Sequence, residues 1–97
     1  MAGVLGRLEN WVLGEPTSEL FASDLRVDTP NGVLSSLQRP TTVRMMVSGG
    51  DDKFGSVVYE HQDAASGQWS RSCLVYFADE GLIRLVYVQN AAITAPA

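Results

Sequence analysis

Residues 69–77 read WSRSCLVYF, and residues 82–90 read LIRLVYVQN. Both runs are rich in β-branched and aromatic residues and contain no proline, so they can pair along their whole length. Between them lies the run ADEG at residues 78–81, a short polar turn whose glycine can take a positive φ angle. The stretch therefore predicts a β-hairpin, and this hairpin decides the fold class.

Two more runs with strand character precede this hairpin. Residues 41–48 read TTVRMMVS, and residues 54–62 read FGSVVYEHQ. The segments that follow them, GGDD at 49–52 and DAASG at 63–67, have the composition of turns. We therefore expect a meander of four consecutive antiparallel strands.

The N-terminal third is expected to be mainly helical. Residues 2–13 place their apolar side chains at the spacing of one helix face. These side chains are Val4, Leu5, Leu8, Trp11 and Val12. A second short helical turn is expected at residues 17–21, where Thr17 or Ser18 can cap it. Residues 32–38 are expected to form one or two further helical turns.

A short strand is expected within this helical part. Residues 24–28 read DLRVD, in which apolar and charged residues alternate, and the run TPNG at 29–32 then ends the strand. Residues 91–97 are expected to fray. Helices followed by a meander indicate an α+β fold in a single domain of residues 1–97, with short N-terminal helices packed on one face of a curved antiparallel sheet.

The composition supports one folded domain and argues against several kinds of partner. The chain has 97 residues, of which 45% are hydrophobic and 19% charged. With a net charge of −4 and scattered basic residues, neither nucleic acid nor a membrane surface is expected as a partner. The N-terminal residues lack signal-peptide character, and no window is apolar enough to span a membrane, so we expect a cytoplasmic location.

Metal and cofactor chemistry is not expected. The single cysteine, Cys73, cannot form an internal disulfide bond or a multi-thiolate metal site. The sequence contains no glycine-rich phosphate loop and no nucleophile elbow. We therefore expect no metal and no cofactor.

The alternation of side chains along the strands assigns residues to the two faces of the sheet. We expect Phe77 to pair with Leu82 and His61 with Trp69. One face, which would be concave and covered by the helices, then collects Val57, Tyr59, His61, Trp69, Arg71, Cys73, Val75, Arg84, Val86 and Val88.

The opposite face is also expected to be apolar. Its large side chains are Leu74, Tyr76, Ile83, Leu85 and Tyr87. A sheet face in contact with water normally carries polar residues, so we expect a second copy of the chain to cover this face in a homodimer. The alternative is a monomer with a somewhat apolar exposed face.

Two stretches resemble the nuclear transport factor 2-like superfamily. Residues 21–32, FASDLRVDTPNG, are similar to the pattern FADDAxVxDPxG that follows the second helix in many members. Residues 77–88, FADEGLIRLVYV, are similar to the final hairpin of that superfamily, FxDGKIxxxxxY. The order of the expected elements agrees over most of the remaining chain.

This resemblance implies a strongly curved, cone-shaped sheet of the cystatin-like roll type, with a pocket between helices and sheet, often in a dimer. The superfamily includes ketosteroid isomerase, polyketide cyclases and many proteins without enzymatic activity. The helical part before Phe21 is short here, and the helix usual between residues 32 and 41 is nearly absent. These departures imply a shallow or open pocket.

The chemistry of ketosteroid isomerase does not transfer to this chain. The general-base aspartate of that enzyme directly precedes the proline of the loop, a position held here by Thr29. Asp28 lies one residue earlier, and a shift of one residue along a strand turns a side chain to the opposite face. The oxyanion-binding aspartate of the isomerase would fall at Cys73. We therefore do not expect the isomerase mechanism.

Four polar residues are candidates for a functional site. Asp28 and His61 are candidate general bases, and the alternative for His61 is a partly solvated histidine at a strand end. Arg71 and Arg84 are candidates for anchoring a ligand carboxylate. The alternative for both arginines is an internal ion pair with Asp24, Asp28 or Glu60.

Tyr59, Trp69, Cys73 and Val86 would complete the lining of the pocket, although each also suits a core position. Three functions remain open. The first is a dimeric module that binds a small apolar or carboxylate-bearing molecule. The second is an isomerase, cyclase or dehydratase that uses Asp28 or His61 as base. The third is a protein-interaction domain whose pocket is filled by its own side chains.

Overall fold

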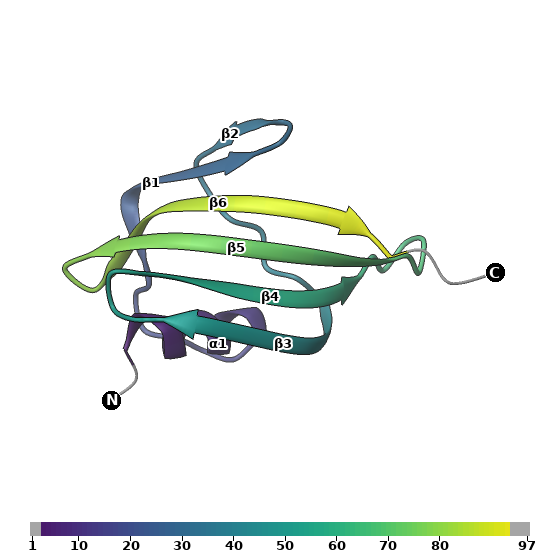
Figure 1. The fold of residues 1–97 in the computed structure, drawn as a ribbon, viewed down its shortest axis with the longest axis horizontal. Coiled ribbons are helices and arrows are strands. Elements are labelled where there is room, and N and C mark those ends of the chain that lie inside the picture. The colour runs from purple at the N-terminus through teal and green to yellow at the C-terminus, as the bar shows by residue number, and fades with distance from the viewer. Residues whose placement is uncertain (1–2, 94–97) are drawn as a thin grey trace.

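The computed structural model describes residues 3–93 and is α+β, as the sequence predicts. The elements are α1 (Val4–Val12), β1 (Phe21–Thr29), β2 (Gly32–Leu34), β3 (Thr42–Gly50), β4 (Phe54–Gln62), β5 (Trp69–Asp79) and β6 (Leu82–Ala92). The strands form one sheet in the order β2-β1-β6-β5-β4-β3 (Figure 1).

The sheet is mixed, whereas the sequence predicted an antiparallel one. β1 runs parallel to β6, with Val27 opposite Val86, and the other neighbouring strands are antiparallel. A parallel pair needs a long connection, because the chain must return to the end of the sheet from which it started. Here the strands from β2 to β5 provide that connection.

α1 packs on one face of the sheet, behind β3 in the view of Figure 1. Its buried side chains follow the predicted spacing and are Val4, Leu8, Trp11 and Val12. The turn between β3 and β4 caps this helix, since Asp52 Oδ1 accepts a hydrogen bond from the backbone N–H of Val4 at 3.0 Å. The carboxylate also lies at the positive end of the helix dipole.

The hydrophobic core lies between α1 and the face of the sheet on which it packs. The sheet contributes Leu25, Val27, Val57, Tyr59, Leu74, Tyr76, Ile83 and Val86. The hydroxyl of Tyr76 donates a hydrogen bond to the carbonyl oxygen of Asp51 at 2.5 Å. Within residues 3–93, every buried side-chain nitrogen or oxygen has a hydrogen-bond partner. We call this side of the sheet the core face and the other side the outer face.

The helical turns predicted at residues 17–21 and 32–38 are wrong. The carbonyl oxygen of Leu20 accepts a hydrogen bond from the backbone N–H of Ile83 at 2.8 Å, which holds the chain extended as it enters β1. Beyond β1, a tight turn reverses the chain so that Gly32 pairs with Thr29 and β2 follows. Backbone pairing with a neighbouring strand thus overrides the weak helical pattern in both segments.

The other predicted strands exist, with some changes in their limits. The strand at residues 54–62 is confirmed with the same limits, and those at 41–48, 69–77 and 82–90 end two residues later than predicted. The strand predicted at 24–28 extends over Phe21–Thr29. Of the tail expected to fray, Ala91 and Ala92 belong to β6, and residues 94–97 lie outside the described part.

The predicted strand register is wrong in both C-terminal hairpins. The turn between β5 and β6 consists only of Glu80 and Gly81, whose φ angles are 54° and 78°. Two residues with positive φ form the tight turn that matches the twist of a hairpin. A bulge follows, so Phe77 lies opposite Leu85 instead of Leu82. Between β4 and β5, Trp69 pairs with Gln62 instead of His61.

The changed register turns β5 over relative to the prediction, because a shift of one residue moves every side chain to the opposite face. Leu74 and Tyr76 therefore lie in the core with 0% exposure, and Ile83 is buried equally. These three residues cannot form the predicted dimer surface. Arg71 and Cys73 turn to the outer face.

β6 keeps its predicted orientation beyond the bulge, because the two register errors cancel there. Val86 is buried in the core, as predicted. Leu85 and Tyr87 lie on the outer face, also as predicted, and Tyr87 is 43% exposed.

Residues 35–41, which we call the strap, cross the core face of the sheet from β2 at one edge to β3 at the other (Figure 1). Leu37 of the strap packs against the core. The guanidinium of Arg39 lies 5.3 Å from the centre of the Trp11 ring, within the range of a cation–π contact. The strap therefore covers part of the core face next to α1.

Candidate functional site

A cleft of about 480 Å³ lies between the strap and the core face of the sheet. Four strands form its sheet side, with Val27, Thr29, Tyr59, His61, Ser72, Leu74, Val88 and Asn90. The strap and its flanks contribute Leu34, Ser36, Leu37, Gln38, Arg39, Pro40 and Thr41. This volume is within the range of small-molecule sites in proteins, and the cleft is partly open to solvent.

Three polar side chains from neighbouring strands form a connected group in the cleft, which we call the polar floor: His61 of β4, Ser72 of β5 and Asn90 of β6. His61 Nε2 lies 2.8 Å from Ser72 Oγ, and Ser72 Oγ donates a hydrogen bond to Asn90 Oδ1 at 3.1 Å. Ser72 pairs with Asn90 across β5 and β6, which explains their contact. Ser72 is 3% exposed, whereas Asn90 is exposed.

Burial affects the two ring side chains beside Ser72 in ways that keep both uncharged. It lowers the pKa of His61 below its ordinary value, so the neutral imidazole predominates at pH 7. It raises the pKa of Tyr59 above its ordinary value. The centres of the Tyr59 and His61 rings are 5.4 Å apart. The floor of the cleft is therefore polar but carries no net charge.

Charged groups occur at the rim of the cleft instead. Arg39 is exposed on the strap, above Trp11. Asp63 follows β4 and is also exposed. Hydrogen bonds from the Ser66 side chain and from the backbone of Ala65 and Ser66 lower the pKa of Asp63, so it is ionised at neutral pH. A ligand in the cleft would thus meet one positive and one negative group near the solvent.

The structure brings together only part of the site predicted from the sequence. Tyr59 and His61 line the cleft, as expected, and Val86 lies in the core beneath it. Trp69, Arg71 and Cys73 belong to the outer face of β5, as the register above requires. These three residues therefore do not line the cleft.

The other predicted site residues form ion pairs away from the cleft. Asp28 accepts a hydrogen bond from Arg26 Nε at 2.8 Å, beside Tyr87 in the neighbouring strand. Arg84 lies 3.1 Å from Asp24 and 4.0 Å from Asp79. The alternative considered for Arg84 from the sequence, an internal ion pair with a carboxylate such as Asp24, is thus present.

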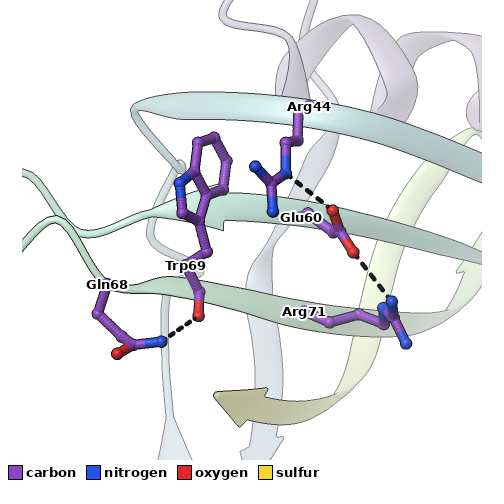
Figure 2. Close-up of polar contacts among 5 residues, drawn as sticks. All are labelled: Arg44, Glu60, Gln68, Trp69 and Arg71. Atoms are coloured by element: carbon purple, nitrogen blue, oxygen red, sulfur yellow. Dashed lines mark hydrogen bonds and ion pairs between the residues drawn. The ribbon is translucent and has the colours of Figure 1, made fainter. Parts of the chain in front are cut away.

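Arg71 has a carboxylate partner as well, in a row of charges across the outer face. Figure 2 shows Arg44, Glu60 and Arg71 side by side on β3, β4 and β5. Each arginine lies 2.9 Å from a different oxygen of Glu60, and Arg71 and Arg44 together lower the pKa of that carboxyl. Arg44 also lies over the ring of Trp69, 3.8 Å from its centre.

Sequence reasoning missed two of the three residues of the polar floor. In the sequence, Ser72 and Asn90 stand among polar neighbours and have the appearance of solvent-facing positions. Only the true register places them next to His61. The signal available in the sequence was the pair of small polar residues Ser70 and Ser72 at alternate positions, directly before the apolar run at residues 73–77.

Neither a metal site nor a membrane-spanning helix is found in the described residues. Residues 3–93 hold no group of three or more His, Cys, Asp or Glu side chains arranged to bind a metal ion. The only helix in that range is too short to cross a membrane. In comparisons with known proteins, the chain matches no family model, no curated protein and no solved structure.

Proposed function

We propose that the protein binds a small, partly apolar molecule in the cleft between the strap and the sheet. The observation that carries this proposal is the polar floor, a connected group of three polar side chains beside aliphatic side chains and the ring of Tyr59. Small-molecule sites characteristically combine apolar walls with a few convergent polar groups. The wall residues here include Val27, Leu37, Leu74 and Val88.

The same geometry favours binding over the other two functions considered from the sequence. A filled pocket would suit a pure interaction domain, whereas this cleft has room for a ligand. An enzyme would have to rely on His61, since Asp28 pairs with Arg26 outside the cleft. A pocket between the sheet and its covering segments is also what the resemblance to the nuclear transport factor 2-like superfamily implies, and membership of that superfamily remains a prediction.

The proposal is tested by blocking the cleft without touching the polar floor. A library of small neutral, cationic and anionic compounds is screened by two-dimensional ¹H–¹⁵N NMR. We expect hits that shift the amide signals of Tyr59, His61 and Ser72. Val88→Trp fills the cleft and should abolish these shifts, whereas Tyr87→Trp, its neighbour on the outer face, should leave them unchanged. A library without hits at these amides, or equal shifts in both variants, would contradict the proposal.

We further propose that a second copy of the chain covers the outer face. Three aromatic side chains form a row there, with Phe54 and Phe77 stacked at 6.4 Å and Phe77 and Tyr87 packed edge to face at 5.9 Å. All three are more than 40% exposed, as is Val47 nearby on β3. Contiguous exposed apolar groups of this kind are typical of interfaces between chains.

The charges at the two ends of β5 support a two-fold arrangement of two copies. Arg71 belongs to a group with two arginines and one glutamate, while Asp79 belongs to a group with two aspartates and Arg84. A two-fold axis near Val75 would bring Arg71 of one copy opposite Asp79 of the other. Opposite charges would then meet on both sides of the aromatic row, which crosses β4, β5 and β6, and the interface would be isologous.

Native mass spectrometry and light scattering test this arrangement. We expect a dimer for the wild type and a folded monomer for Phe77→Glu, because this substitution places a charge in the centre of the aromatic row. Leu13→Glu, at an exposed apolar position outside the sheet, should remain dimeric. A monomeric wild type at about 100 µM, well above the dissociation constants of stable dimers, would contradict the proposal.

A further inference from the structure

We propose that the ligand of the cleft is an uncharged molecule that presents a hydroxyl or carboxamide group to His61 and Asn90. This inference rests on the binding function proposed above and adds the chemical class of the ligand. It follows from counting the hydrogen atoms available in the polar floor.

The hydroxyl of Ser72 has a single hydrogen. Ser72 Oγ donates that hydrogen to Asn90 Oδ1 at 3.1 Å, so it cannot also donate to His61. The 2.8 Å contact between His61 Nε2 and Ser72 Oγ must then have Nε2–H as the donor. Because burial also favours the neutral ring, the proton of His61 resides on Nε2 and Nδ1 keeps a free lone pair.

The polar floor therefore keeps one unused hydrogen-bond acceptor and one unused donor. His61 Nδ1 can accept a hydrogen bond, and the amide nitrogen of Asn90 can donate. Within residues 3–93, the hydrogen bonds of these two side chains are those made by His61 Nε2 and Asn90 Oδ1 to Ser72. A ligand group that both donates and accepts can satisfy the two remaining capacities together, as alcohols and carboxamides do.

A carboxylate matches this floor poorly, contrary to the expectation from the sequence. It accepts hydrogen bonds but cannot donate one to His61 Nδ1. It would also bring a charge next to buried apolar side chains, which is costly. The cation that lines the cleft, Arg39, is exposed on the strap at the rim, over Trp11, and not part of the polar floor. The two arginines predicted to anchor it, Arg71 and Arg84, pair instead with Glu60 and Asp24 at 2.9 and 3.1 Å.

An ammonium group is disfavoured for the complementary reason. It can donate to His61 Nδ1 but offers no lone pair to the amide nitrogen of Asn90. The cleft should thus discriminate by hydrogen-bonding character among molecules of the same shape. A bound ligand excludes water from the polar floor, and leaving one of its polar groups unpaired then costs enough to weaken binding by about ten-fold or more.

Four probes with a common phenylalkyl body test the inference: 4-phenylbutan-1-ol, 4-phenylbutanamide, 4-phenylbutanoate and 4-phenylbutylamine. Their dissociation constants are measured by NMR titration of the wild-type protein at pH 7.5. We expect the alcohol and the amide to bind about ten-fold more tightly than the two charged probes. Equal or tighter binding of the carboxylate or the amine would overturn the inference while leaving the binding function intact. Binding of none of the four would overturn the inference, while the library screen above judges the binding function independently.

Two further measurements use the same samples. Asn90→Ala should weaken binding of the amide about five-fold or more, whereas Gln89→Ala, its neighbour on the outer face, should have no effect. The ¹⁵N shifts of the His61 ring should show a protonated Nε2 and an unprotonated Nδ1. A proton on Nδ1 in the free protein, or equal affinities in the two variants, would overturn the assignment of donors and acceptors.

Discussion

The Oδ1 atom of Asp52 lies 3.0 Å from the backbone nitrogen of Val4, across 48 positions of sequence. This hydrogen bond joins the turn between β3 and β4 to the first turn of α1. The residue at the N-cap position itself is Gly3, which supplies no capping side chain. The helix therefore depends on the sheet for its N-terminal cap.

Removal of this cap should destabilise the protein measurably. We expect Asp52→Ala to lower the free energy of unfolding by about 1 kcal/mol, the usual cost of losing an N-cap. Asp52→Asn keeps an acceptor oxygen and should lower the free energy of unfolding by less. Urea denaturation followed by circular dichroism measures both, with Glu15→Ala at an exposed position as control. An Asp52→Ala protein as stable as that control would show that the bond contributes nothing.

The orientation of β5 can be tested by two neighbouring substitutions. Leu74→Ala removes a side chain with 0% exposure and should cost about 2–5 kcal/mol. Val75→Ala, at a half-buried position on the outer face, should cost clearly less. Chemical denaturation of the two variants gives the comparison. The register expected from the sequence would give the reverse order.

A substitution in the turn between β5 and β6 should raise the stability of the protein. Glu80 has a φ angle of 54°, a conformation that asparagine adopts more readily than glutamate. Glu80→Asn creates an Asn-Gly turn and should raise the free energy of unfolding by about 0.5 kcal/mol. The same exchange at the exposed Glu15, outside any turn of this kind, should change the urea midpoint very little. A loss of stability in Glu80→Asn would speak against the two-residue turn.

His61 should make the stability depend on pH near neutrality. Its pKa in the folded protein is lowered, so between that pKa and the ordinary value of 6.5 the unfolded chain binds more protons. Stability should therefore fall as the pH drops below 6.5 and should be insensitive to this group above about pH 7.5.

The measurement compares urea midpoints of the wild type and His61→Gln between pH 5.5 and 8. The wild type should lose more stability than the variant at the acidic end, since glutamine does not titrate. Parallel curves for the two proteins would mean that burial does not shift the pKa of His61.

The sequence was sufficient for features that a single segment determines. The spacing of Val4, Leu8 and Trp11 marks the buried face of α1, and the alternation within residues 54–62 marks β4 with its observed limits. These patterns are local, because one helix face or one strand face produces them regardless of the partner.

Features that depend on how two segments pair could not be predicted from the sequence. A glutamate is an unusual residue for positive φ, so Glu80 gave no sign of a two-residue turn. The bulge after this turn has no marker such as a glycine. β2 is three residues long and exposed throughout, with no periodicity to detect. The polar floor was missed for the same reason, since Ser72 reaches His61 only in the observed register.

The parallel pairing of β1 with β6 has a consequence for the order of folding. During translation, residues 21–29 leave the ribosome long before residues 82–92, their partners in the finished sheet. The local hairpins from β3 to β6 can form early, since contacts close in sequence form fastest. β1 must wait for this late event before it gains its partner β6, so nascent chains that stop short of residue 82 leave that edge of β1 unpaired and should be the ones that chaperones bind.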